Sequence, residues 1–508
     1  MFKLLALTLN KHPSLGSLQL NFVDANEEGK GPYTTLLIGA NGTGKSNILR
    51  VIIDIFREMS AMQVSDKKYY VPATYYIKYK IDDDYYEFQN HSKAEKDGIH
   101  VAVPAESHTR KNGAHIDISK MKLPKKIIAN AIMLNDKFPM VPSKPEDIYQ
   151  YMGIRRSPST AGTQTSIRRT VSNIAEAIDG DDFKKDLSDI LDFLNLKHKL
   201  YVYYYPKYKH YFFKGDLTIK KFKAFFENWK EITKRKTEPW SLKYYNNIKD
   251  RDEEIEDLIK FINFITSKLK YESARTQYFQ YDIFSSNDLK NDFELLKKLS
   301  SFDLLYYPSL GLERESEGDS DYELESSSSG EYHFLVSMLS MIAKIKEDSL
   351  ILIDEPEISL HPNWQIKYIN FLKKIFGKYK SAHFIIASHS HFLVSDLEKD
   401  TSSIIGLTRD TPESPIKAEL IESNTYGWSA EDVLYNIFGA ATTRNLYLAN
   451  EIGDLLKEIS TGDYNSESIN NKIRELNRVK LQLKDVDPLK AVIEKLNKKF
   501  LASQDDKL

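Results

Sequence analysis

The stretch "YTTLLIGANGTGKSNILRVIIDIF", residues 33–56, joins an apolar run, a glycine-rich turn and an amphipathic segment. Its turn, Gly39 to Ser46, matches the phosphate-binding pattern G-x-x-x-x-G-K-S at every fixed position. The apolar run predicts a buried strand, and the apolar residues spaced three or four apart after the turn predict a helix. This order of elements predicts a loop whose backbone N–H groups surround a phosphate at a helix N-terminus.

The glycine-rich turn supplies the first candidate site residues. We expect Lys45 to reach the β- and γ-phosphates of ATP, and the Ser46 hydroxyl to ligate Mg²⁺. The residues of this loop that we expect to contact the nucleotide are Asn41, Gly42, Thr43, Gly44, Lys45, Ser46 and Asn47.

A second stretch, "DSLILIDEPEISLHP" at residues 348–362, supplies the acidic residues that such a site needs. Its apolar run is typical of a central parallel strand, and Asp354 follows at the C-terminal end, where ligands bind in open α/β sheets. Asp354 is therefore predicted to hold Mg²⁺ together with Ser46, and Glu355 is placed to polarise an attacking water. The alternative is a surface acidic turn, which the apolar residues before it disfavour.

The stretch "SSSSGEYHFL", residues 326–335, follows an acidic segment, and its composition alone is typical of a solvated linker. However, apolar residues at helical spacing come after it, so the serines are expected at a helix N-terminus that attracts an anion. Gly330 lies 24 positions before Asp354, and Asp354 lies 309 positions after Lys45. The chain therefore carries a long insertion between its two phosphate-site motifs.

These motifs, in this order and spacing, resemble those of the ABC-type ATPases of the OLD, RecF and SMC class. A further motif, "IIASHS" at residues 385–390, adds the histidine that this class carries after the strand that follows the acidic one. The resemblance implies an α/β fold, namely an ABC-type P-loop ATPase head with a mixed sheet and flanking helices. It also implies that two heads hold two ATP molecules between them.

The resemblance implies roles for single residues. Glu355 is expected to be the general base, and His389 is expected to contact the γ-phosphate, so these two are the catalytic candidates. Ser328, Ser329 and Gly330 are expected to reach ATP from the opposite subunit. A head-to-head homodimer is then the smallest active assembly.

Two positions of the class pattern are less clearly matched. Ser327 stands where a leucine usually leads the serine-glycine motif, so either of the two following serines could take the leading role. The γ-phosphate-sensing position has no clear motif: Gln89 lies in an alternating stretch typical of a hairpin, and we favour Asn135–Asp136 instead. The loop Glu357 to Pro362 is expected to touch the partner head.

The insertion contains two stretches that each allow two interpretations. The first, residues 149–171, is a polar loop with four arginines: Arg155, Arg156, Arg168 and Arg169. It could bind a nucleic-acid backbone or could be solvated, and the sequence favours neither. The second, residues 199–215, interleaves tyrosine with lysine, as in single-strand binding surfaces. We favour a twisted hairpin with one aromatic face buried.

The domain organisation follows from these segments. The tail contains one D-x-D pattern, Asp485 to Asp487, but no apolar strand precedes it, and Pro488 after it favours a helix start. We therefore expect no Toprim nuclease in this chain. The expected parts are the first part of the head at 1–140, a mainly helical insertion at 141–300, the second part of the head at 301–425, and a helical docking region at 426–508.

Composition limits the remaining classes. A chain of 508 residues is too long for one ordinary core, and its net charge of −2 gives no global basic field for nucleic acid. The absence of cysteine rules out disulfides and thiolate metal sites and fits a cytoplasmic protein. No window of 18 apolar residues predicts a membrane span.

An ATPase head with helical additions and no recognised effector domain favours a sensor subunit that controls a separate nuclease. The overall plan resembles the ATPases of the Septu and PARIS anti-phage systems, PtuA and AriA, and Septu is favoured. The expected partner is then a nuclease of the HNH or Toprim type. The alternatives are a RecF-like DNA-binding repair ATPase and a stand-alone nuclease with an unfamiliar site.

Overall fold

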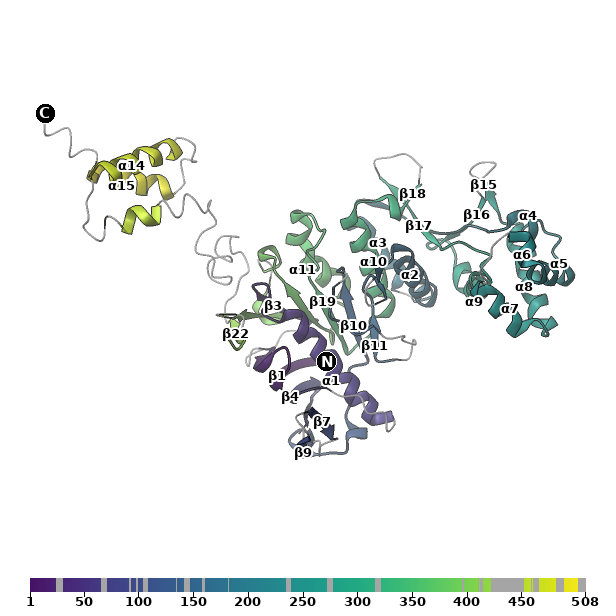
Figure 1. Cartoon of the computed structure of the whole chain (residues 1–508), viewed down its shortest axis with the longest axis horizontal. Coiled ribbons are helices and arrows are strands. Elements are labelled where there is room, and N and C mark those ends of the chain that lie inside the picture. The colour runs from purple at the N-terminus through teal and green to yellow at the C-terminus, as the bar shows by residue number, and fades with distance from the viewer. Residues whose placement is uncertain are drawn as a thin grey trace. The chain divides into compact units, whose positions relative to one another are not determined.

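The computed structural model divides into two compact units, Met1–Val433 and Leu434–Leu508, whose elements are labelled in Figure 1. The structure describes residues 1–23, 31–64, 71–90, 93–96, 99–103, 108–133, 135–140, 147–157, 160–180, 182–233, 239–271, 277–315, 321–394, 397–409, 411, 414–421, 452–457, 459, 466–480 and 488–500.

A seven-stranded sheet forms the centre of the first unit, with the order β11-β10-β19-β20-β3-β21-β22. Its strands pair in parallel, except that β22 runs antiparallel to β21 at the edge. Strands β10, β19 and β20 are buried along their whole length, as expected from apolar runs covered on both faces. The bounds are Tyr149–Tyr151 (β11), Lys126–Ala131 (β10), Ser349–Asp354 (β19), His383–Ser388 (β20), Tyr33–Gly39 (β3), Ser402–Thr408 (β21) and Lys417–Ile421 (β22).

Helix α1, Lys45–Val64, joins the central sheet to a second, antiparallel sheet. Its apolar residues belong to one core cluster with residues from both sheets, so the phosphate loop at its N-terminus is anchored on both sides. The second sheet has the order β2-β1-β4-β5-β8-β9. Its bounds are Gly16–Asn21 (β2), Lys3–His12 (β1), Thr74–Ile81 (β4), Asp84–Asn90 (β5), His108–Lys111 (β8) and Ala114–His115 (β9).

Four helices build the layer that carries the serine-glycine motif. Helix α10 contacts α2, α3 and β10, and α11 contacts α3. Aromatic rings of Phe193, Phe334 and Phe371 lie 4.3–5.2 Å apart and tie α3, α10 and α11 together. The bounds are Thr163–Ala177 (α2), Phe183–Phe193 (α3), Ser329–Lys344 (α10) and Pro362–Phe376 (α11).

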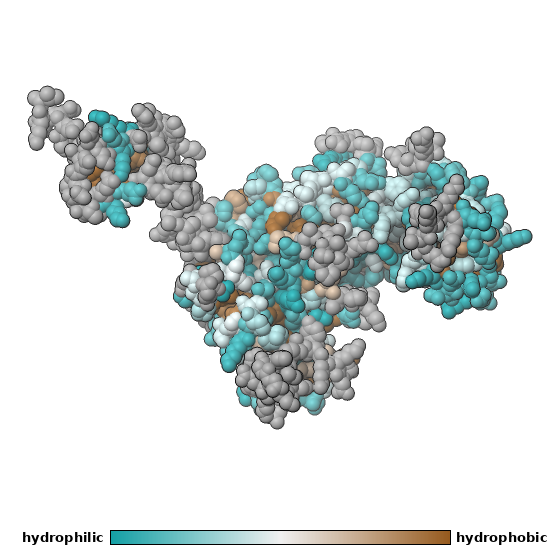
Figure 2. Space-filling model, viewed as in Figure 1, coloured by the Kyte–Doolittle hydropathy of each residue, from teal (hydrophilic) through white to brown (hydrophobic). Residues whose placement is uncertain are grey.

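A five-stranded antiparallel sheet with the order β15-β16-β14-β17-β18 takes three strands from the insertion and two, β17 and β18, from the residues after 300. The helices expected between 218 and 300 are present, and the face of this lobe seen in Figure 2 is mainly hydrophilic. The bounds of these strands and helices are Lys270–Tyr271 (β15), Gln277–Asp282 (β16), Leu196–Tyr204 (β14), Ser309–Arg314 (β17), Asp321–Glu323 (β18), Lys209–Phe212 (α4), Ile219–Glu227 (α5), Trp229–Thr233 (α6), Trp240–Ile248 (α7), Asp252–Thr266 (α8) and Asp288–Ser301 (α9).

The prediction of a local hairpin within residues 199–215 is wrong, because the strand in this stretch has its partners elsewhere in the chain. Strand β14 pairs with β16 and β17, which come later in the chain, and α4 follows it directly. Tyr203 and Tyr204 are buried, as expected for an aromatic face packed into the protein. Tyr203 donates to Asp321 and Tyr201 to Glu313, so these rings serve the sheet and the interpretation as a stacking surface is not supported.

The second unit consists of helices in its described part. Helices α14 and α15 pack around a small apolar core, and α15 begins at Pro488 as expected. No helix in the described part of the whole chain is both long enough and apolar enough to cross a membrane. The remaining elements are Lys93–Lys96 (β6), Ile99–Val103 (β7), Arg155–Ser157 (β12), Thr160–Ala161 (β13), Ile118–Lys120 (η1), Leu324–Ser326 (η2), His391–Leu393 (η3), Lys399–Thr401 (η4), Ser466–Lys480 (α14) and Pro488–Phe500 (α15).

Candidate nucleotide site

The carboxyl ends of β3, β19 and β20 lie side by side and carry the candidate site. Strand β3 ends at Gly39 and α1 begins at Lys45, so the intervening turn closes over the helix N-terminus. Gly44 has φ +88°, and a Cβ on it would lie 2.6 Å from Leu15 Cδ2. A side chain would be strained at this positive φ, which explains why the motif fixes glycine at this position.

Lys45 lies buried over the phosphate loop. Its Nζ donates to the carbonyls of Gly39 at 2.8 Å and Ala40 at 3.3 Å, and lies 3.3 Å from His389 Nδ1. Burial lowers the pKa of Lys45 to about 8, although neighbouring carboxylates, Glu355 above all, oppose this. The ammonium is thus held where a phosphate oxygen could replace the loop carbonyls as its partner.

Asp354 and Ser46 form the candidate magnesium site. The Ser46 hydroxyl donates to Asp354 Oδ1 at 3.0 Å, and Asp354 is only 1% exposed. Burial raises the pKa of Asp354 to about 7, and its buried Oδ2 has no hydrogen-bond partner among the described residues. A hydroxyl and a carboxylate with an unused oxygen are the hard ligands that Mg²⁺ prefers, so the residues fit this ion.

Glu355 and His389 face each other next to Lys45. Glu355 adopts a left-handed conformation with φ +49°, and its N–H donates to the Ala387 carbonyl at 2.8 Å, which ties it to β20. The His389 ring lies 3.3 Å from Glu355 Oε1 through its Nε2. The contact with His389 lowers the pKa of Glu355, so this carboxylate is ionised at neutral pH, as a general base must be.

The structure therefore brings together the five side chains that sequence motifs singled out from three distant segments. Lys45 and Ser46 come from the phosphate loop, Asp354 and Glu355 from the end of β19, and His389 from the end of β20. A buried lysine, a buried aspartate and a histidine-paired glutamate at one sheet edge can bind phosphates, hold a cation and activate water.

The serine-glycine motif starts α10. Ser328 and Ser329 are exposed, and Ser328 is the N-cap whose hydroxyl accepts from Glu331 N–H at 3.2 Å. Ser327, the departure from the class pattern, closes the preceding turn through Leu324 O at 2.7 Å. Within the described residues, no hydrogen bond joins the two exposed serines to the phosphate loop of the same chain.

Gly330 packs against the loop that follows the acidic strand. A Cβ on Gly330 would lie 2.3 Å from the carbonyl oxygen of Ser359, which itself has φ +71°. The glycine thus lets α10 approach residues 357–360 closely. Glu331 is fixed from the other side, by Tyr322 OH at 2.6 Å and Arg314 at 3.3 Å.

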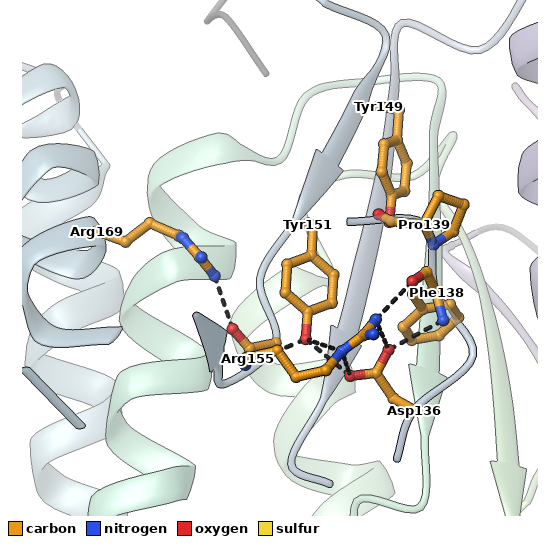
Figure 3. A network of polar contacts seen from close by, with 8 residues as sticks. Asp136, Phe138, Pro139, Tyr149, Tyr151, Arg155 and Arg169 are labelled. Atoms are coloured by element: carbon orange, nitrogen blue, oxygen red, sulfur yellow. Dashed lines mark hydrogen bonds and ion pairs between the residues drawn. The ribbon is translucent and has the colours of Figure 1, made fainter. Parts of the chain in front are cut away.

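The favoured sensing pair, Asn135–Asp136, is not supported by the geometry. Asn135 is exposed, and Asp136 is buried, where it accepts from Arg155 Nε at 2.7 Å, Tyr151 OH at 2.7 Å and Phe138 N–H at 2.9 Å. Figure 3 shows how these donors enclose the carboxylate. Both oxygens of this carboxylate are therefore already occupied by partners from its own loop, from β11 and from β12. Gln89, the rejected candidate, lies within strand β5.

The arginine-rich stretch also differs from a nucleic-acid contact loop. Arg155 is 7% exposed and its guanidinium also donates to Phe138 O at 2.5 Å. Arg169 donates to Gly153 O at 2.6 Å, as seen in Figure 3. Arg168 is exposed, whereas the surroundings of the Arg156 side chain lie outside the described residues. Arg155 therefore serves the protein interior and the half-buried Arg169 binds a backbone carbonyl, which disfavours this loop as a phosphate-backbone surface.

The sequence motifs did not identify Glu357 as a residue of the site. Glu357 was expected only as part of the loop facing a partner head, yet its Oε1 accepts from the His389 N–H at 2.6 Å. The only sequence signal was a second glutamate two positions after Glu355. That signal says nothing about which backbone amide the side chain meets.

Comparisons with known proteins place the chain among ATPases. A family model described as AAA ATPase domain (AAA_15) matches residues 15–394. The Septu protein PtuA of Bacillus thuringiensis is 27% identical over 147 residues, which cover 29% of this chain and 35% of that protein. The chain therefore aligns with about a third of that relative's length.

Two solved structures also match, with little sequence identity. The Smc head domain with an extended coiled coil bound to the C-terminal domain of ScpA, from Pyrococcus furiosus, shares 17% identity over 83% of this chain and 96% of that chain, with a TM-score of 0.33. The SMC head domain from Thermotoga maritima shares 11% identity over 83% and 99%, with a TM-score of 0.35. Both TM-scores are too low for these overlaps to carry an argument about this chain. Because the family model spans most of the chain, including the whole candidate site, the chain belongs to the AAA_15 family of AAA ATPase domains.

Proposed function

We propose that this ATPase is the regulatory subunit of an anti-phage defence complex and controls a separate nuclease. One observation carries the proposal: an assembled site of Lys45, Ser46, Asp354, Glu355 and His389 lies in a chain that is similar to the Septu protein PtuA. Nucleotide binding and hydrolysis would then set whether the nuclease is silent or active.

In this proposal each residue of the site has one task. Lys45 binds the β- and γ-phosphates, and Ser46 with Asp354 would hold Mg²⁺, which supplies positive charge against the phosphates. Glu355 accepts a proton from the attacking water, since its contact with His389 keeps it ionised. His389 lies beside Lys45 and contacts the γ-phosphate.

The proposal includes a second copy of the chain. Ser328 and Ser329 are exposed at the N-terminus of α10, a sixteen-residue helix whose free N–H groups and dipole favour an anion. We propose that they complete the site of the partner head by meeting its γ-phosphate. Each head then gives one half of each of two sites.

The test is phage protection with the product of the neighbouring gene, which we expect to be a nuclease of the HNH or Toprim type. Co-expression should protect bacteria from phage, and the two proteins should copurify. Protection should disappear with Lys45→Ala and stay with Lys220→Ala, an exposed lysine of α5. A chain that copurifies with nothing and protects cells alone would refute the regulatory role.

A further inference from the structure

Glu357 lies in the turn between β19 and α11. Its Oε1 accepts a hydrogen bond from the backbone N–H of His389 at 2.6 Å. His389 is the first residue after β20, so its N–H falls outside the ladder of the sheet. A short bond from a carboxylate to this amide fixes the backbone from which the imidazole projects.

The direction of that imidazole matters for the site. Its Nδ1 lies 3.3 Å from Lys45 Nζ, and its Nε2 lies 3.3 Å from Glu355 Oε1. Both contacts come from one ring, so a small rotation of the His389 backbone would break both at once. The residue before it, Ser388, ends a fully buried strand, so the sheet already holds the backbone on that side of His389.

A second contact holds the same loop against the turn that carries Glu357. Gln365 of α11 donates to the Glu357 carbonyl at 3.3 Å and to the Leu360 carbonyl at 3.0 Å. Its Oε1 accepts from the Ser390 hydroxyl at 2.7 Å. Two contacts thus join the turn after β19 and the start of α11 to the loop after β20, one at His389 and one at Ser390.

We propose that Glu357 is a positioning residue for ATP hydrolysis and acts through the backbone of His389. The carboxylate acts only as an acceptor, for the His389 N–H and for the nearby Ser388 hydroxyl. Burial, with the nearby Glu355, raises the pKa of Glu357, and both its ionised and protonated forms keep an acceptor oxygen. Glutamine should therefore replace it, whereas a side chain without an acceptor should not. This inference rests on the proposed role of His389 in hydrolysis.

The test compares four variants of the full-length chain in steady-state ATP hydrolysis. Glu357→Ala and Glu357→Leu, the second of which keeps the volume, should each lower kcat on the order of tenfold, with KM for ATP changed less than about twofold. Glu357→Gln should stay within about threefold of the original kcat, since its amide oxygen can accept the same bond. Glu253→Ala, at an exposed acid of α8, is the matched control and should change neither constant.

The His389→Ala background separates the two proposals. If Glu357 acts through His389, adding Glu357→Leu to His389→Ala should lower kcat by less than about twofold more. A full tenfold loss in both backgrounds would overturn the inference, as would an unchanged kcat in Glu357→Leu. If His389→Ala alone keeps full turnover, the proposed role of His389 fails first. Thermal unfolding and nucleotide affinity show whether each variant is folded.

Discussion

At the scale of single residues, the fold places oppositely charged side chains in close contact in the site. The sequence motifs predicted Lys45, Ser46, Asp354 and Glu355 because each sits at a fixed place next to a strand end. They did not predict the role of Glu357, whose partner His389 is 32 residues away and depends on how two loops meet. Contacts of this kind follow from tertiary packing and leave no local pattern.

Lys45 gives the first prediction. Its ammonium is the only cation that the described residues place against both the loop carbonyls and His389. Lys45→Ala should therefore lower ATP affinity at least on the order of a hundredfold, because one buried charged contact to phosphate is worth about 3 kcal/mol. Isothermal titration with ATP and Mg²⁺ measures this, and Lys220→Ala should bind normally. Affinity unchanged in Lys45→Ala would remove the lysine from the site.

Asp354 gives a prediction for pH. Its pKa is raised to about 7, above the usual 3.8. The folded state therefore keeps, as pH rises, a proton that the unfolded state releases at a lower pH. Without nucleotide, the contribution of Asp354 to the free energy of unfolding should therefore fall as pH rises from about 4 to about 7. Asp354→Asn removes this loss, so its advantage over the original chain should grow across that window.

The measurement is chemical denaturation at pH 5 and pH 8 in the presence of a chelator. The advantage of Asp354→Asn should be on the order of 1–3 kcal/mol larger at pH 8 than at pH 5. Asparagine keeps an oxygen that can accept from Ser46, so the hydrogen bond itself is little changed. An equal advantage at both pH values would contradict the raised pKa.

At the scale of elements, the parallel strands were predictable and the pairing in the insertion was not. Strands β19 and β20 are unbroken apolar runs followed by polar site residues, which marks buried parallel strands in the sequence. Strand β14 pairs with β17, more than a hundred residues later, and its alternation was consistent with a local hairpin as well. Local pattern fixes which face of a strand is buried but leaves its partner open.

The loop after β10 gives a prediction about a buried ion pair. Arg155 Nη2 lies 2.5 Å from Asp136 Oδ1, with both side chains almost fully buried. Arg155→Met should lower the free energy of unfolding by about 3–5 kcal/mol, because it leaves Asp136 as an unpaired buried charge. Arg168→Ala, at an exposed neighbour on α2, should change it by less than about 0.5 kcal/mol.

A companion variant tests the origin of that loss. Arg155→Met combined with Asp136→Leu removes both charges and should recover part of the stability. Denaturant unfolding measures all three proteins. If Arg155→Met is as stable as the original chain but loses salt-dependent DNA binding, the arginine acts at a nucleic-acid surface and the buried pair is not its main role.

The start of α10 gives a further prediction. A Cβ on Gly330 would meet the Ser359 carbonyl at 2.3 Å, so Gly330→Ala forces the helix away from the loop after β19. We expect the free energy of unfolding to fall by about 1–3 kcal/mol. We also expect the rate of ATP hydrolysis to fall by more than this loss of stability alone would cause. Gly453→Ala is the control, because nothing lies near that position and alanine favours a helix. Unchanged turnover in Gly330→Ala would mean that this close approach has no part in hydrolysis.

At the scale of the whole molecule, each proposed ATP site takes residues from two copies of the chain. The cluster around Lys45 is assembled within one head, whereas Ser328 and Ser329 are exposed on α10. The sequence motifs predicted both groups of residues. The structure assembles the first around Lys45 and leaves the two serines exposed at the start of α10. A site completed by a second copy is the proposal that joins them, and it predicts that two defective chains can repair each other.

The most direct test mixes two inactive variants, Lys45→Ala and Ser328→Arg. In a head-to-head dimer, each variant alone has two defective sites, whereas a mixed dimer has one intact site. An equal mixture should therefore recover about a quarter of the original ATP hydrolysis rate, since half of the dimers are mixed and each has one of two sites. If the mixture hydrolyses no more ATP than the two variants do separately, the site is complete within one chain and the account of a shared site is contradicted.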